Sequence, residues 1–268
     1  MMRRKIARTP EDLSSRDKQI VCGLFLSKYD KAGLAYLGFE SFSEAFNAIG
    51  YGLGAKPASI KNYRDELDPF FPNTRQGWHR RPLREHCKRI MERYRAVSLP
   101  DLGDVIRTFL SPDQELERLP EVRDVLRRQT DEGQSSFAKR LITGKAAEAY
   151  FVANYRSMPE FVGAALKDTT QWGCGFDFKM TAKEGEYSAV EVKGLRSRLG
   201  QIQFTDLEHA MADALSDRYY LVLVLNFAEQ PFHSIFRNPL ASGLTFERTE
   251  RKEVRISWLA DVGEQKRA

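Results

Sequence analysis

The segment 173–194 contains three residues whose types and spacing suit the cleavage of a phosphodiester bond. Asp177 is followed after a short connection by Glu191, and Lys193 stands two residues beyond Glu191. Paired carboxylates bind Mg²⁺ or Mn²⁺ through hard oxygen ligands, and the ion keeps positions open for water and substrate phosphate. A neighbouring lysine can orient the attacking water or offset phosphate charge. This combination is therefore a candidate metal-dependent catalytic site, with Asp177 and Glu191 as the metal ligands.

Two strands joined by a turn must position these three residues. Apolar and polar residues alternate over 176–179 and again over 189–193, as they do in half-buried strands. Asp177 and Glu191 are equidistant from position 184, so an antiparallel hairpin centred there places their carboxylates opposite each other. Lys193 shares the face of Glu191 because side chains alternate along a strand. An ordinary exposed pair of acid and lysine is the alternative explanation of the same pattern.

The flanking segments predict the rest of a compact core. A helix is expected over about 135–155 and carries Glu148, and a short strand over 201–204 carries Gln203. The segment 205–208 reads as a capping box that opens a helix, which explains Thr205 and Glu208 structurally, so neither is assigned a catalytic role. The apolar run 219–225 is typical of a strand buried on both faces. This order of helices and strands predicts an α/β (α+β) fold with a mixed sheet flanked by helices.

The N-terminal part reads as helical from about residue 17 to residue 95. A glycine-rich break over 50–54 separates two short helices, and the second is expected over 59–68 with Ser59 as its N-cap. In this helix Ile60, Tyr63 and Leu67 share one face, and polar and basic residues, Arg64 included, face outward. This is the outline of a helix-turn-helix, whose second helix enters a DNA major groove. A simple solvated helix with a basic outer face is the alternative.

Basic residues are concentrated in the same region. The segment 56–95 has more than twice as many basic as acidic residues, in a chain of formal net charge +5. A loop over 73–83 combines arginines with a tryptophan and a histidine, which suits contact with phosphates and bases; alternatively, its tryptophan anchors the loop in the core. The predicted DNA contacts are Lys56, Ser59, Lys61, Asn62, Arg64, Arg75, Trp78, His79, Arg80 and Arg81.

Length and composition limit the number of domains and the class of protein. The chain of 268 residues has room for two domains, and we divide it into a helical DNA-binding domain (1–96), a partly helical connector (97–134) and a catalytic domain (135–268). Its three cysteines are scattered and indicate neither a disulfide framework nor a zinc site. No apolar run is long enough to span a membrane, and no secretory leader is recognisable. A cytoplasmic protein is expected.

The order of these residues resembles the PD-(D/E)XK nuclease superfamily, to which many restriction enzymes belong. The resemblance rests on Glu148, Asp177, the run Glu191-Val192-Lys193 and Gln203. A glycine and a phenylalanine precede Asp177 where the superfamily often has a proline. Residues 190–194, with Phe204-Thr205, Glu208, Ala212 and the strand 220–224, look more closely like the protein NO VEIN C-terminal family, which is regarded as a nuclease-like domain of bacterial defence loci.

The resemblance implies roles for these residues. Asp177 and Glu191 would hold Mg²⁺, with Mn²⁺ as a substitute, and Lys193 would place or activate water. Glu148 would be an auxiliary acid and Gln203 a phosphate or water contact. We therefore expect a Mg²⁺-dependent DNA endonuclease, most simply a type II-like restriction or phage-defence enzyme.

The expected partners are double-stranded DNA, a second copy of the chain and a cognate methyltransferase encoded nearby. Two alternatives stay open. One is a non-cleaving nuclease-fold module that binds DNA or senses modified bases. The other is a nuclease subunit that works with a partner ATPase, since the chain has no phosphate-binding loop of its own.

Overall fold

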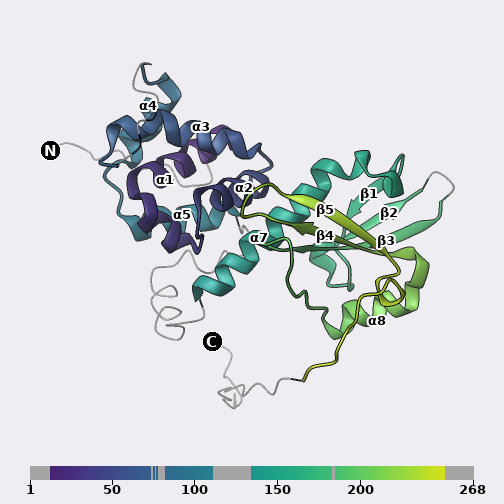
Figure 1. The fold of residues 1–268 in the computed structure, drawn as a ribbon. Helices are drawn as coiled ribbons and strands as arrows, with labels where there is room; N and C mark the ends of the chain where they lie inside the picture. Colours follow the sequence, from purple (N-terminus) through teal and green to yellow (C-terminus); the bar gives the residue numbers. More distant parts are fainter. Residues whose placement is uncertain are drawn as a thin grey trace, which may run out of the picture.

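A computed structural model describes residues 13–73, 75, 77, 82–110, 134–182 and 185–250 of the chain. The helices of the N-terminal half form one lobe, and a sheet with its covering helices forms the other (Figure 1). This mixed architecture is the α+β fold that the sequence predicts. No helix among the described residues is long and apolar enough to cross a bilayer.

The helical lobe is built around a long central helix, α1. Ser14 caps the N-terminus of α1 through its side chain, and Gly38 ends the helix in the left-handed conformation that glycine adopts without strain. The helix is kinked at Asp30, whose backbone is not helical. The helices of the lobe are α1 (Ser15–Leu37), α2 (Phe42–Gly52), α3 (Pro57–Leu67), α4 (Glu85–Tyr94) and α5 (Leu99–Leu110).

The pair α2 and α3 is present where the sequence predicts two short helices joined by a turn. The expected N-cap at Ser59 is wrong, because α3 already begins at Pro57 and Lys56 occupies the cap position. Proline fits the first helical position well, since its missing N–H group would have no partner there. Ser59 therefore lies in the first turn of the helix, and its N–H donates to the Lys56 carbonyl at 2.8 Å.

The second lobe contains a five-stranded sheet in the order β1-β2-β3-β4-β5. The first three strands form an antiparallel meander, β4 runs parallel to β3, and β5 returns antiparallel to β4. Parallel neighbours need a crossover connection, which α8 supplies between β3 and β4. The elements are α7 (Gln134–Asn154), β1 (Ala165–Asp168), β2 (Phe178–Thr181), β3 (Tyr187–Gly194), α8 (Asp206–Leu215), β4 (Tyr219–Leu225) and β5 (Phe232–Arg237).

Helices cover both faces of this sheet. Phe178, Val190 and Val222 join the large buried cluster on the face covered by α7. The ring of Phe151 in α7 lies 5.2 Å from that of Phe178, and such aromatic pairs contribute about 0.5–1.5 kcal/mol beyond their area burial. On the other face, Ala212 of α8 packs with the strand residues Ala189 and Tyr219.

The two lobes share one core rather than meeting at a polar seam. The largest buried cluster runs from α1 through α2 and α7 into the sheet. The ring of Tyr51 in α2 lies 5.1 Å from that of Tyr150 in α7. The buried Asn47 amide donates to the carbonyls of Phe227 and Glu229 at 2.8 and 2.9 Å. The division into domains at 96 and 134 stays a prediction, and most of the predicted connector (111–133) lies outside the described residues.

The structure contradicts one predicted strand of the sheet and confirms another. The strand expected over 201–204 is wrong, because these residues form an irregular loop between β3 and α8. The buried strand expected over 219–225 is confirmed as β4. Strands β1 and β5, which the sequence reading did not identify, complete the sheet at its two edges.

Candidate active site

The β2–β3 hairpin brings the predicted residues together. Phe178 pairs with Val190 and Thr181 with Tyr187, so the pairing is symmetric about position 184, as predicted. Asp177 lies just before β2, one residue outside this paired register, and two hydrogen bonds hold it against β3. The Asp177 N–H donates to the Val190 carbonyl at 3.0 Å, and its carboxylate accepts the Val192 N–H at 2.9 Å.

Lys193 lies between two carboxylates. Its Nζ is 2.6 Å from Oε1 of Glu191 and 3.0 Å from Oε2 of Glu208. The ring centroid of Phe204 lies 5.7 Å from the same nitrogen. Lys193 therefore shares the face of Glu191, as the alternation of the strand predicts, and its ammonium group is held in one place by charge on two sides.

Burial gives the acid pair unusual electrostatics. Burial raises the pKa of Asp177 to about 7, and the negative charge of Glu148 adds to this shift while the Val192 N–H opposes it. Glu191 is only 3% exposed, and burial together with the charge of Asp177 raises its pKa to about 8 in spite of the ion pair with Lys193. Two such carboxylates favour a bound cation, because a positive charge offsets the cost of ionising both.

The pKa of Lys193 is shifted by opposing effects. Burial alone lowers it, because an ammonium group loses hydration. The attraction of Glu191 and Glu208 outweighs burial and leaves the pKa of Lys193 raised. Lys193 is therefore a fixed positive charge at neutral pH rather than a proton acceptor.

Glu208 is the residue that the sequence reading left without a site role. The predicted capping box is present: Thr205 Oγ1 accepts the Glu208 N–H, and Glu208 Oε2 accepts the Thr205 N–H at 2.8 Å. The same Oε2 atom also reaches Lys193, because the crossover lays the first turn of α8 beside the end of β3. In the sequence, the capping box is a sufficient structural explanation for Glu208. Only the presence of Glu208 in the NO VEIN-like pattern pointed to a role at the site.

Glu148 and Gln203, the other two predicted site residues, differ in their relation to the acid pair. Glu148 lies on α7 in an ion pair with Lys145 at 3.1 Å, and it is near enough to Asp177 to raise the pKa of that carboxyl. Gln203 is exposed on the irregular loop before α8. Among the described residues, the structure gives Gln203 no hydrogen bond to Asp177, Glu191 or Lys193. The geometry thus brings Glu148 close to Asp177, whereas no bond in the described residues links Gln203 to the acid pair.

The predicted DNA contacts in the helical lobe divide into three groups. Lys56, Lys61 and Asn62 are exposed along α3, and Ser59 is half-buried in the first turn of this helix. Trp78, His79, Arg80 and Arg81 lie outside the described residues. Arg64 is buried, so its expected outward orientation is wrong, and Arg75 is partly buried.

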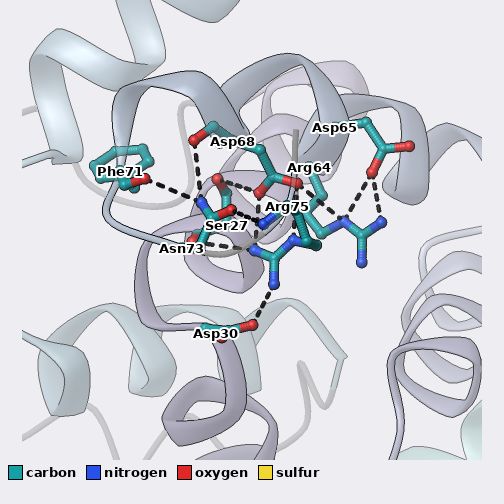
Figure 2. A network of polar contacts seen from close by, with 8 residues as sticks. All are labelled: Ser27, Asp30, Arg64, Asp65, Asp68, Phe71, Asn73 and Arg75. Carbon is teal, nitrogen blue, oxygen red and sulfur yellow. Dashed lines mark hydrogen bonds and ion pairs between the residues drawn. The ribbon is translucent and has the colours of Figure 1, made fainter. Parts of the chain in front are cut away.

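Arg64 and Arg75 turn inward because a buried acid attracts them (Figure 2). Asp68 is 1% exposed, and its carboxylate accepts bonds from Ser27 Oγ and from Arg75 Nε and Nη2, each at 2.8 Å. Arg75 also pairs with Asp30 at the kink of α1. Arg64 pairs with Asp65 and stacks 4.8 Å from the rings of Phe42 and Phe46. Both guanidinium groups thus stabilise the helical lobe.

The fold and the site together define a mixed-sheet domain with one buried carboxylate, one half-buried carboxylate and one lysine on a central hairpin. Residues 147–236, about a third of the chain, match the family model described as protein NO VEIN, C-terminal. The matched segment runs from α7 into β5 and contains Asp177, Glu191, Lys193 and Glu208. No curated protein and no solved structure matches the chain.

Proposed function

We propose that this chain is a Mg²⁺-dependent DNA endonuclease. The observation that carries the proposal is the close pair of the half-buried Asp177 and the buried Glu191 on one hairpin, with Lys193 bonded to Glu191. The element order α7–β1–β2–β3–α8–β4 and the NO VEIN-like segment support a nuclease-like core. They also support the likeness to the PD-(D/E)XK superfamily.

The donor set suits the proposed ion. Among the described residues, no group of three or more His, Cys, Asp or Glu side chains lies in a geometry that could hold a metal by itself. Mg²⁺ is typically bound by one or two carboxylates and completed by waters and substrate phosphate, so Asp177 and Glu191 are a sufficient protein contribution. The Val192 N–H and Lys193 each engage one oxygen of these carboxylates, and the second oxygen of each is not used in those contacts. When bound, the ion would supply an activated water and neutralise phosphate charge.

The chain's own residues have distinct tasks in this proposal. Asp177 and Glu191 fix the ion on the rigid hairpin. Lys193 places a positive charge where negative charge develops on the phosphate, which is the kind of stabilisation that lowers the barrier most. Glu208 and Glu191 hold the ammonium group in position before the substrate arrives.

The helical lobe supplies the proposed DNA-reading surface. Lys56, Lys61 and Asn62 are available on α3, whereas Arg64 and Arg75 are removed from the list of contacts by their ion pairs. A type II-like restriction or phage-defence enzyme with a cognate methyltransferase is the biological role that we propose. One site cuts one strand, so double-strand cleavage would involve a homodimer or two successive cuts.

Conversion of supercoiled plasmid to nicked or linear DNA tests the proposal. The purified chain is expected to cut with Mg²⁺ or Mn²⁺ and to stop in EDTA. Asp177→Asn should lower the rate by at least about 100-fold, because the ion loses one of its two charged ligands. Asp104→Asn is the control, since Asp104 accepts a bond from Tyr36 in the helical lobe, away from the site.

Two results would contradict the proposal. Cleavage that is unchanged in Asp177→Asn would rule out the assigned site. DNA binding without cleavage of modified or unmodified DNA in any divalent metal would favour the non-cleaving module.

A further inference from the structure

A second group of basic residues lies on the same sheet face as the acid pair and outside the predicted DNA contacts. Lys179 on β2 pairs with Ala189 on β3, two residues before Glu191, and therefore points to the same face as Glu191. Lys167 on β1 is the direct cross-strand partner of Lys179. Arg218 stands immediately before β4, beside the start of β3.

Each of these cations lies over an aromatic ring. Lys167 Nζ is 4.4 Å from the ring centroid of Trp172, and Lys179 Nζ is 4.5 Å from that of Tyr187. The Arg218 guanidinium carbon lies 5.3 Å from the same Tyr187 ring. We call these five residues the hairpin patch: Lys167, Trp172, Lys179, Tyr187 and Arg218.

The charge of the hairpin patch is not balanced by neighbouring acids. Two lysines placed directly opposite each other on adjacent strands repel, so the pairing of Lys167 with Lys179 costs stability. Within the described parts of the chain, no carboxylate forms an ion pair with Lys167, Lys179 or Arg218. Asp168, next to Lys167, accepts bonds from Thr170, and Asp217, next to Arg218, pairs with Arg237.

Trp172 adds an exposed aromatic surface beside this charge. It is 61% exposed at the outer end of the connection that leads from β1 to Asp177. The Thr169 N–H closes this connection by donating to the Asp177 carbonyl at 2.9 Å. Trp172 is thus a large exposed ring on a closed loop beside a cation, where its face is available to stack on a base.

We propose that the hairpin patch binds the phosphate backbone of DNA on one side of the cleavage site. This inference rests on the proposed nuclease function. A repeat of about 3.3 Å per residue places Lys179 about 7 Å along the strand from Asp177 and Tyr187 about 13 Å from Glu191. A DNA strand carries one charge per about 3.4 Å of axis, so the patch would hold phosphates some two to four nucleotides from the one that is cut. A DNA strand that crosses this face would be bound by the hairpin patch next to the acid pair. The same duplex would also contact the helical lobe.

Charge reversal in the hairpin patch can be tested by DNA binding, without a measurement of cleavage. The probe is a fluorescein-labelled DNA duplex, measured by anisotropy with the full chain in Ca²⁺ and again in EDTA. Lys167→Glu and Arg218→Glu, on different elements, should each weaken binding about tenfold and lower the slope of log Kd against log salt by about one or more. Trp172→Ala should weaken binding about threefold or more through lost stacking, with little change in the salt slope.

Arg156→Glu is the matched control. Arg156 is an exposed arginine over a tyrosine ring, 5.6 Å from its centroid, and it follows α7 rather than lying on the α8 face. Its charge reversal should change binding by less than about twofold beyond the general effect of net charge. The melting temperature should not fall in any of the four variants, and that of Lys167→Glu should rise slightly because the repulsion from Lys179 is replaced by attraction.

The outcomes separate the patch from the nuclease activity. Equal binding by the patch variants and by Arg156→Glu would overturn the patch, even if the wild-type chain cuts DNA. Selective loss of binding in the patch variants would support the patch, even if no cleavage were found. An RNA duplex of the same sequence that bound more tightly than DNA through these residues would overturn the choice of DNA.

Discussion

At the scale of single residues, the site is defined by carboxylates whose ionisation the protein makes costly. Asp177 is half-buried beside the buried Glu191, and the pKa of each is raised, to about 7 and about 8. A raised pKa means that the folded state binds protons which the unfolded state has already released. Metal-free stability should therefore fall as the pH rises from about 4 to about 8.

Asp177→Asn should make the metal-free protein more stable at pH 8. The amide removes a buried negative charge, and its oxygen can still accept the Val192 N–H. The gain should be on the order of 2 kcal/mol, seen as several degrees of melting temperature in EDTA. It should shrink as the pH is lowered toward 4, where the wild-type carboxyl is already protonated.

Added Mg²⁺ provides the complementary comparison. It should raise the melting temperature of the wild-type protein at pH 8 and have much less effect on Asp177→Asn, because binding to the folded state stabilises it. A variant that melts below the wild type at pH 8 would show that the charge of Asp177 is not a cost.

At the scale of elements, the sequence predicted what local periodicity determines. The register of the hairpin, the buried strand β4 and the cap of α8 follow from alternation and short-range signals, and all three are confirmed. The orientation of Arg64 could not be predicted, because it depends on Asp68 and on two rings of α2. The second role of Glu208 likewise requires the crossover that brings α8 to Lys193.

The contact between α7 and the hairpin can be tested at Gly194. A Cβ there would lie 2.8 Å from the Thr143 carbonyl oxygen and 2.9 Å from the Ala147 Cβ, so Gly194→Ala should destabilise by about 1–3 kcal/mol. Gly144 lies on α7, beside Thr143, and a Cβ added to it would have no atom within 4 Å. Gly144→Ala should therefore stabilise by about 0.5–1 kcal/mol. Chemical denaturation of both variants measures the difference, and equal effects would contradict the close approach of α7 to β3.

At the scale of the whole molecule, the helical lobe and the sheet are joined by buried contacts. The continuous core cluster and the Tyr51 contacts with Tyr150 and Phe227 make α2 part of the packing of the second lobe. The ion pair of the half-buried Arg196 with the buried Glu44 adds a polar link between the loop after β3 and α2. The proposed DNA-reading surface on α3 would thus be held in a fixed relation to the candidate site on the β2–β3 hairpin.

Asn47→Ala should destabilise both lobes together. Removal of the amide leaves the Phe227 and Glu229 carbonyls without its two hydrogen bonds, at a cost of about 1–3 kcal/mol. Asn62→Ala, on the exposed face of α3, should change stability by less than about 0.5 kcal/mol. Thermal unfolding followed by calorimetry should show one transition that shifts as a whole. Two separate transitions, with only one affected, would show that the lobes unfold independently.

The most direct test of the central claim is the rate of DNA cleavage by Lys193→Ala under single-turnover conditions with Mg²⁺. The matched control is Lys28→Ala, because Lys28 is also a partly buried lysine and donates to the Val97 carbonyl at 2.7 Å in the helical lobe. Lys193→Ala should bind DNA with nearly wild-type affinity and cleave it at least about 100-fold more slowly, whereas Lys28→Ala should cleave at the wild-type rate. Cleavage by Lys193→Ala at the wild-type rate would contradict the assignment of the Asp177, Glu191 and Lys193 site.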